Sequence, residues 1–108
     1  MDIKTTKESV FWVYDGQPCG HNGSDITLAK ELPQFEAVAV LDNESMLVYN
    51  YNGSIRFIVR SEGPYAFAVR DVFDNGYILC HYPTLPGNLY VCVLDWNTGT
   101  MQMKVRYE

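Results

Sequence analysis

The stretch from Phe35 to Arg60 constrains the fold of this chain more than any other. It contains three apolar runs separated by two turn signals, Asp42-Asn43 and Asn52-Gly53. Asn-Gly is a strong β-hairpin signal because both residues tolerate a positive φ. Apolar and polar residues alternate within the runs with a period of two, which is typical of strands. We therefore predict three antiparallel strands, at Glu36–Leu41, Met46–Tyr51 and Ser54–Arg60.

Similar patterns continue on both sides of this stretch. A run of β-branched and aromatic residues predicts a strand at Val10–Tyr14. Turn residues at 61–64, 74–76 and 97–99, and a loop at 83–88, separate the later apolar runs. These later runs predict four more strands, at Tyr65–Val72, Tyr77–Tyr82, Leu89–Asp95 and Thr100–Tyr107.

Two segments before Phe35 carry different predictions. Residues 15–24 are rich in Gly, Pro, Asn and Asp, which indicates a long loop. Asp25–Leu32 is the only segment that predicts a helix, because Ser24 is a suitable cap and Pro33 would end it. Its apolar residues have helical spacing, at Ile26, Ala29 and Leu32.

The predicted fold is all-β with one short helix, in a single domain covering residues 1–108. A chain of 108 residues suits one domain with its own hydrophobic core. Short connections make about eight sequential strands antiparallel neighbours, in two four-stranded meander sheets. Two such sheets can bury their apolar faces against each other as a β-sandwich. A partial barrel and assembly with further copies of the chain are the alternatives.

Two parts of the chain echo each other. Tyr51–Ser54 and Trp96–Thr100 both run aromatic, Asn, Gly, hydroxyl, with one Thr inserted in the second. The offset between Asn52 and Asn97 is 97 minus 52, or 45 residues. A period in the forties built from antiparallel strands resembles the blade of a β-propeller. Two such sheets are too few to close a propeller, which contains about four to eight blades.

Negative charge is concentrated in the first half of the chain. The formal net charge is −5, and the segment from Glu8 to Asn50 contains only one basic residue, Lys30. An acidic surface repels phosphate, which disfavours direct nucleic-acid binding. It attracts basic proteins and accelerates their association. A mildly acidic surface that serves only solubility is the simpler alternative.

The residues that most often carry chemistry are few. Cys19-Gly20-His21 would supply half of a zinc site, but no second pair of Cys and His residues completes it, so no metal or cofactor is expected. Cys80 and His81 are neighbours on a predicted strand and should point to opposite faces. No nucleophile motif or phosphate-binding glycine loop is present. The chain is therefore not expected to be an enzyme.

The cysteines bear on the compartment. The sequence contains neither an export signal nor an apolar run long enough to span a membrane, so reduced thiols and a cytoplasmic location are expected. A disulfide between Cys80 and Cys92 is the alternative, and one residue of strand register decides whether the two thiols face each other.

The function expected from these features is protein binding. In general build the chain is similar to the small acidic immunity proteins that bacteria make against their own secreted nuclease toxins, including those of contact-dependent growth inhibition. That resemblance implies a tight one-to-one complex in which the chain covers the active site of a basic toxin domain. The predicted contact surface consists of acidic residues in the first half, Asp15, Asp25, Glu31, Glu36, Asp42 and Glu44.

Two other functions compete with this one. A β-sandwich that binds carbohydrate or another small ligand would use Trp12, Tyr14 or Trp96 as a stacking surface. An enzyme would have to rely on Cys19 and His21, and it ranks last.

Overall fold

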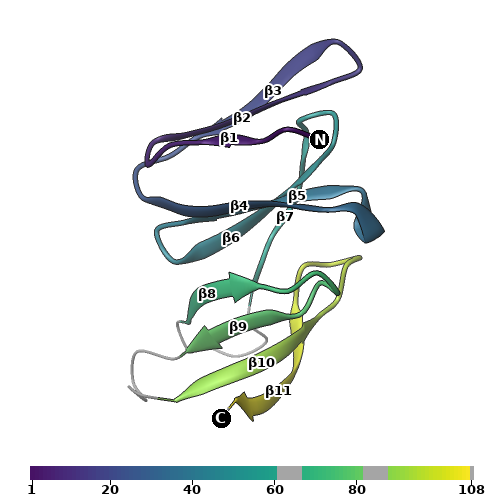
Figure 1. Cartoon of the computed structure of the whole chain (residues 1–108). Helices are drawn as coiled ribbons and strands as arrows, with labels where there is room; N and C mark the ends of the chain where they lie inside the picture. Colours follow the sequence, from purple (N-terminus) through teal and green to yellow (C-terminus); the bar gives the residue numbers. More distant parts are fainter. Residues whose placement is uncertain (61–66, 82–87, 108) are drawn as a thin grey trace.

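The computed structural model describes residues 1–60, 67–81 and 88–107. These residues form eleven β-strands in three antiparallel sheets, which follow one another along the chain as a stack (Figure 1). The predicted all-β class is confirmed. The predicted count of eight strands and the two-sheet sandwich are wrong, because the segment before Phe35 adds strands that build a third sheet.

The first sheet contains β1 (Lys4–Thr5), β2 (Ser9–Tyr14) and β3 (Gln17–Asn22), in the order β1-β2-β3. The long loop predicted at residues 15–24 is therefore wrong. Asp15 and Gly16 have φ angles of +50° and +76°, which makes them a tight hairpin turn between β2 and β3. Strand β3 lies at the edge of its sheet, where a proline such as Pro18 is tolerated because its missing N–H interrupts no ladder.

The second sheet is central in the stack. It contains β4 (Ile26–Leu32), β5 (Ala37–Asp42), β6 (Ser45–Asn50) and β7 (Ile55–Ile58), in the order β4-β5-β6-β7. A short 3-10 helix, η1 (Pro33–Phe35), joins β4 to β5. Residues 37–41 of β5 are fully buried, since one face of the strand packs on the first sheet and the other on the third.

The helix predicted at Asp25–Leu32 is wrong, because this segment is strand β4 and the described residues contain no α-helix. A β-bulge between Ile26 and Leu28 shifts the alternation of the strand by one residue. Ile26 and Ala29 consequently face the first sheet, whereas Leu28 and Leu32 face the third. The bulge thus produces the three-residue apolar spacing that imitates a helix.

The third sheet contains β8 (Ala68–Val72), β9 (Ile78–His81), β10 (Leu89–Leu94) and β11 (Met101–Tyr107), in the order β11-β10-β9-β8. Every strand predicted from residue 35 onward is thus present with slightly different ends. The predicted turn at 61–64, most of the loop at 83–88, and the strand ends at Tyr65 and Tyr82 lie outside the described residues.

Two hydrophobic layers hold the stack together. Between the first and second sheets, Val10, Trp12 and Cys19 pack against Val38 and Val40. The larger layer between the second and third sheets is built from side chains of all four strands on each side, including Leu32, Leu41, Met46, Val48, Val72, Ile78, Cys80, Cys92 and Leu94. Such burial, at about 25 cal/mol per Å² of apolar surface, is the main source of stability.

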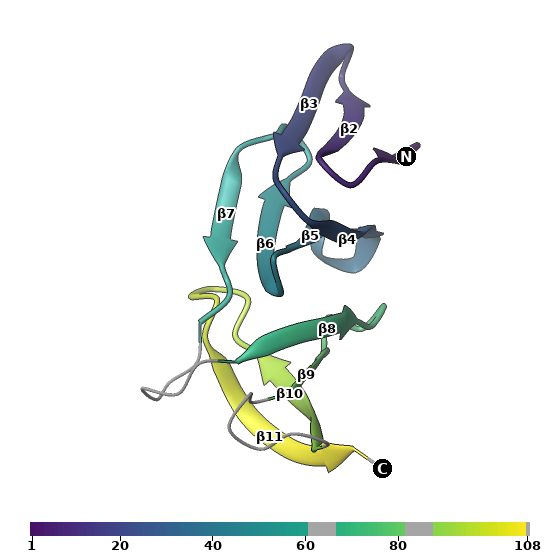
Figure 2. The ribbon, with the colours of Figure 1, turned by 90° about the vertical axis from the view of Figure 1, so that its left-hand side faces the viewer.

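Polar and aromatic contacts fix how the sheets sit on one another. The Trp12 Nε1–H donates to the backbone oxygen of Tyr51 over 2.9 Å and joins the first sheet to the second. Trp96, in the β10–β11 turn, stacks on Phe35 with ring centroids 4.0 Å apart and joins the third sheet to the second. The first strands of the sheets lie towards one side of the stack and the last strands towards the other (Figure 2).

Candidate functional site

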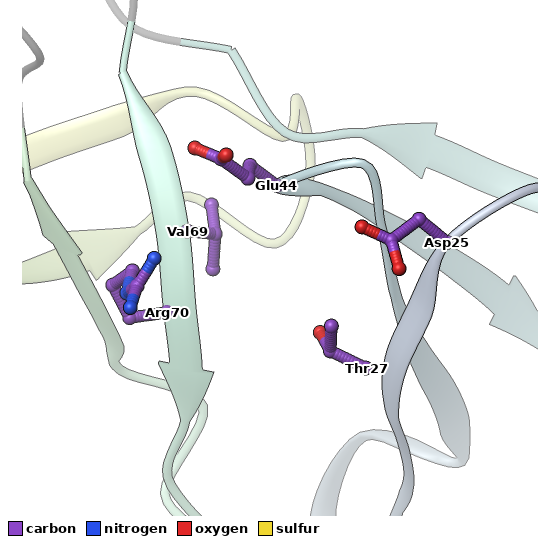
Figure 3. A pocket seen from close by; sticks show the side chains of 5 residues that line it. All are labelled: Asp25, Thr27, Glu44, Val69 and Arg70. Atoms are coloured by element: carbon purple, nitrogen blue, oxygen red, sulfur yellow. The ribbon is translucent and has the colours of Figure 1, made fainter. Parts of the chain in front are cut away.

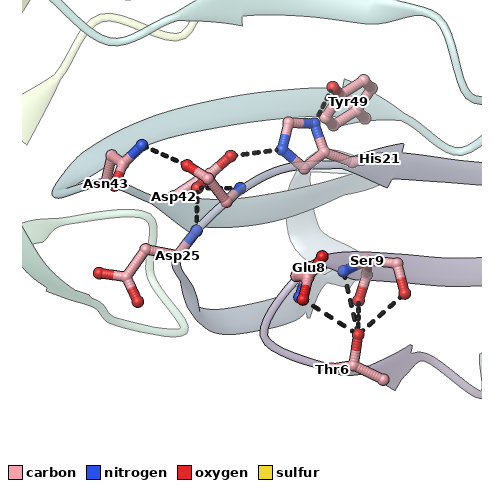
Figure 4. Close-up of polar contacts among 9 residues, drawn as sticks. Thr6, Glu8, Ser9, His21, Asp25, Asp42, Asn43 and Tyr49 are labelled. Atoms are coloured by element: carbon pink, nitrogen blue, oxygen red, sulfur yellow. Dashed lines mark hydrogen bonds and ion pairs between the residues drawn. The ribbon is translucent and has the colours of Figure 1, made fainter.

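Asp42 organises a network of polar contacts at one end of the central sheet. Its Oδ1 accepts hydrogen bonds from the backbone N–H groups of Asp25 and Ser24, over 3.0 and 3.3 Å. Its Oδ2 lies 2.9 Å from Nε2 of His21 (Figure 4). The hydrogen bonds from His21 and the Asp25 amide hold the pKa of the Asp42 carboxyl below its usual value. Asp42 is therefore an internal anchor, and only 12% of its side chain is exposed.

His21 links this anchor to a half-buried tyrosine. Its Nδ1 lies 2.6 Å from the hydroxyl of Tyr49, so that His21 bridges Tyr49 and Asp42 (Figure 4). Burial, and then the charge of Asp42, raise the pKa of Tyr49 above its usual value. With both ring nitrogens occupied by partners, His21 is held as a structural bridge between β3 and β5.

Asp25 and Glu44 are the two acidic side chains that this framework leaves exposed. The backbone oxygen of Asp25 accepts from the Asn43 N–H over 3.1 Å, and the backbone oxygen of Glu44 accepts from the Val69 N–H over 2.7 Å. Both backbones are thus tied to neighbouring strands, and both carboxylates point towards β8 (Figure 3). The turn that carries Glu44 adopts positive φ at Asn43 and Glu44, +51° and +66°.

A pocket of about 170 Å³ lies between these carboxylates and β8, lined by Asp25, Thr27, Glu44, Val69 and Arg70 (Figure 3). Sequence reasoning identified Asp25 and Glu44 but missed Thr27, Val69 and Arg70. No local signal could have found them, because β8 reaches this position only through the packing of the third sheet on the second.

The other three predicted contact residues lie elsewhere. Glu31 accepts a hydrogen bond from the Tyr51 hydroxyl over 2.7 Å and lies 3.4 Å from the amino group of Met1. Glu36 is exposed after η1, at the opposite end of β5 from Asp42. Asp15 is exposed at the β2–β3 turn. The structure therefore brings together Asp25, Asp42 and Glu44 but distributes Glu31, Glu36 and Asp15 over other parts of the molecule.

The residues considered for chemistry have structural partners. The Cys19 thiol lies 3.6 Å from the backbone oxygen of Tyr51, while His21 binds Asp42 and Tyr49. Cys80 lies against Cys92 with 3.0 Å between the sulfur atoms, and the two cysteines are not joined by a disulfide. Within residues 1–60, 67–81 and 88–107, no group of three or more His, Cys, Asp or Glu side chains has the arrangement of a metal site.

The two tryptophans considered for carbohydrate stacking pack against other side chains of the protein, Trp12 fully buried and Trp96 partly buried. Trp12 is fully buried, and Trp96 stacks on Phe35 and meets the Phe57 ring edge-on. Tyr14 is exposed and lies against Tyr51, with ring centroids 5.6 Å apart. Trp12 is therefore not accessible to a ligand, and the Phe35 ring occupies one face of Trp96.

Comparison with known proteins identifies no relative. No protein-family model, curated protein or solved structure matches this chain. In the part of the chain that the structure describes, no helix is long and apolar enough to cross a membrane.

Proposed function

We propose that this chain is a protein-binding module that inhibits a basic partner, such as a nuclease-type toxin domain, by covering its active site. The observation that carries the proposal is the pair of exposed carboxylates, Asp25 and Glu44, beside the pocket between the second and third sheets. A lysine or arginine side chain of the partner would enter between them. The small size, the net charge of −5 and the similarity in build to bacterial immunity proteins agree with this role.

The way the two carboxylates are held favours tight binding. Hydrogen bonds fix the backbone of Asp25 to Asp42 and Asn43, and that of Glu44 to Val69. A partner cation therefore meets carboxylates on a rigid frame, which reduces the entropy lost on binding. Hydrogen bonds between charged groups are also about twice as strong as neutral ones.

The pocket is electrostatically uneven. Arg70 lines it together with the two carboxylates, so the described lining has one more acidic than basic side chain. This arrangement suits a single extra cation and disfavours phosphate, which agrees with a partner that is a protein and not a nucleic acid.

The first experiment identifies the partner. The immobilised chain is used to capture proteins from the source cell, and the nuclease activity of any captured basic protein is assayed with and without the chain. A basic nuclease that loses activity at one equivalent of the chain supports the proposal. A captured protein that keeps full activity at saturation contradicts inhibition.

The second experiment assigns the surface with matched variants. Asp25→Asn with Glu44→Gln removes two negative charges from the pocket, and Asp15→Asn with Glu36→Gln removes two elsewhere. The pocket variant should associate with the captured protein about tenfold more slowly at low salt and show a weaker salt dependence. Equal effects of the two variants would contradict the assignment of the binding site to the pocket.

A further inference from the structure

The outer face of the third sheet is apolar, although the hydrophobic layers of the described residues do not include it. In β10, Cys92 and Leu94 are buried towards the second sheet, whereas Leu89, Val91 and Val93 alternate on the opposite face and are only half-buried. Val91 pairs with Leu79 on one side and with Val105 on the other, so these three side chains share the outer face. Val105 is 59% exposed.

Comparison of β10 with β5 shows what such a strand requires. The sequences LYVCVL and AVAVL both lack charged residues, as is typical of strands covered on both faces. Residues 37–41 of β5 are covered on both faces by the first and third sheets. Among the described residues, only one sheet covers β10. The other face of β10 is apolar, like the two covered faces of β5.

The first sheet has an apolar outer face of a different shape. Val10 and Trp12 are buried towards the second sheet, whereas Phe11 and Val13 point away from it and are 44% and 53% exposed. Phe11 lies opposite Gly20 on β3. A hollow of about 460 Å³ lies beside Phe11, lined also by Pro18, Gly20 and Asn22.

These two outer faces lie at the two ends of the stack. Within the stack, the chain already makes two contacts of one sheet on the next. The first sheet packs on the second and the second packs on the third, with the first strands of the sheets on the same side (Figure 2). In the order of the stack, the outer face of the third sheet thus corresponds to the face of the second sheet on which the third sheet packs. Likewise, the outer face of the first sheet corresponds to the face of the second sheet on which the first sheet packs.

We propose that two copies of this chain form a head-to-tail dimer, in which the outer face of the third sheet of each copy packs on the outer face of the first sheet of the other. Because the contact forms twice, the ring closes and no end face remains exposed. The branched side chains around Val91 would enter the hollow beside Phe11. If two third sheets paired instead, the branched side chains around Val91 would meet each other, and the hollow beside Phe11 would stay empty.

Charge and size are compatible with this arrangement. Lys4 lies opposite Phe11 on the outer face of the first sheet, and Asp71 lies opposite Leu79 on the outer face of the third. Each belongs to the first strand of its sheet, so the two side chains approach each other in the dimer. Two copies of three sheets contribute six, which falls within the roughly four to eight sheets of closed radial arrays.

The test measures the mass of the chain in solution by sedimentation equilibrium over a wide concentration range. The wild-type chain should reach twice the monomer mass. Val91→Lys and Phe11→Glu should each raise the dimer dissociation constant by at least about tenfold, since every dimer of one variant contains two damaged contacts. A wild-type chain that stays monomeric, or that grows into open polymers, would overturn the proposal.

Mixing the two variants distinguishes head-to-tail packing from pairing of like faces. A mixed dimer has one native contact and one contact in which the introduced lysine of the first variant meets the introduced glutamate of the second. An equimolar mixture should therefore recover dimer. If Phe11→Glu alone leaves the dimer intact while Val91→Lys disrupts it, the third sheets pair with each other and the head-to-tail arrangement is wrong.

Two further variants control for folding. Ile58→Lys places the same charge at an exposed apolar position of β7, on neither end face, and should leave the dimer intact. Circular dichroism checks the fold of each variant. If Val91→Lys does not fold, Val105→Lys replaces it, because its more exposed side chain lies on the same face. Dimerisation unaffected by Val105→Lys would then contradict the proposal.

Discussion

Nε2 of His21 lies 2.9 Å from Oδ2 of Asp42, and this contact joins strand β3 of the first sheet to strand β5 of the second. The other ring nitrogen of His21 lies 2.6 Å from the hydroxyl of Tyr49 on β6. One imidazole therefore joins an edge strand to two strands of the central sheet. The same Asp42 fixes the backbone beside the candidate binding pocket, so the stability of the fold and the geometry of the pocket depend on one carboxylate.

Replacement of His21 by alanine should destabilise the protein. The variant leaves the Tyr49 hydroxyl and one Asp42 oxygen without their partner at a half-buried position, at a cost of about 1–3 kcal/mol. Urea unfolding measures this change. Asn22→Ala, at an exposed position next to His21, is the control and should stay within about 0.5 kcal/mol of the wild type. Equal stability of the two variants would show that the bridge contributes little.

Asp42 should make the protein sensitive to acid. Its pKa in the folded protein lies below the ordinary value of 3.8, chiefly because of the His21 and Asp25 hydrogen bonds. The stabilisation from this carboxylate is therefore fully present above pH 3.8 and is lost as the pH falls through the folded pKa. The free energy of unfolding of the wild type minus that of Asp42→Asn should shrink over this acidic range. A constant difference would contradict the assignment.

Tyr51 should make the stability of the protein depend on pH in the alkaline range. Burial and the hydrogen bond to Glu31 raise its pKa from 10.0 to about 12. A raised tyrosine pKa means that the stabilisation is complete below pH 10.0 and disappears as the pH rises towards about 12. In urea unfolding, the stability advantage of the wild type over Tyr51→Phe should decline across this interval. The prediction fails if the advantage persists at the upper end.

Gly76 should tolerate a side chain less well than Gly16. Both have positive φ, +87° and +76°, so alanine strains either backbone by about 1–2 kcal/mol. At Gly76 the added Cβ would also lie 2.5 Å from the Phe35 ring and 2.8 Å from Trp96 Nε1, whereas at Gly16 nothing lies within 4 Å. Gly76→Ala should therefore cost about 1–3 kcal/mol more than Gly16→Ala in urea unfolding. Similar costs would show that the ring stack yields easily.

Cys80 and Cys92 should form a disulfide under oxidising conditions. Their sulfur atoms lie 3.0 Å apart on paired strands, so a movement of about 1 Å brings them to the bond length of about 2.05 Å. Oxidised glutathione would accept the two hydrogen atoms and be reduced to two thiols. Mass spectrometry should then show the loss of two hydrogens from the peptides containing these residues. Cys19→Ser should behave identically, and mixed disulfides alone would contradict the prediction.

Strand positions could be predicted from residue 35 onward because local turn chemistry and alternation agree there. Asn52-Gly53 and the alternation around Val48 indicate a hairpin with no help from the rest of the chain. Before residue 35 the strand at Val10–Tyr14 was predicted correctly, as β2, but two other signals misled. Pro18 and Gly20 hid an edge strand, and the bulge after Ile26 imitated helical spacing. The resemblance to a β-propeller blade and the similarity to immunity proteins stay predictions.

The candidate site was only half accessible to the same reasoning. Asp25, Asp42 and Glu44 come from one region of the sequence, and their acidity was evident from composition. Asp42 turns inward to His21, whereas Asp25 and Glu44 line a pocket beside β8. This difference depends on which sheet covers which face.

The sequence by itself determined the all-β class and the later strands that follow turn signals, because alternation and turn preference act over a few residues. Only the tertiary structure decided that these strands form three sheets in place of two, and that β5 is covered on both faces while β10 is covered on one. The physical reason is that a strand's apolar residues specify that a face must be buried, but not what buries it.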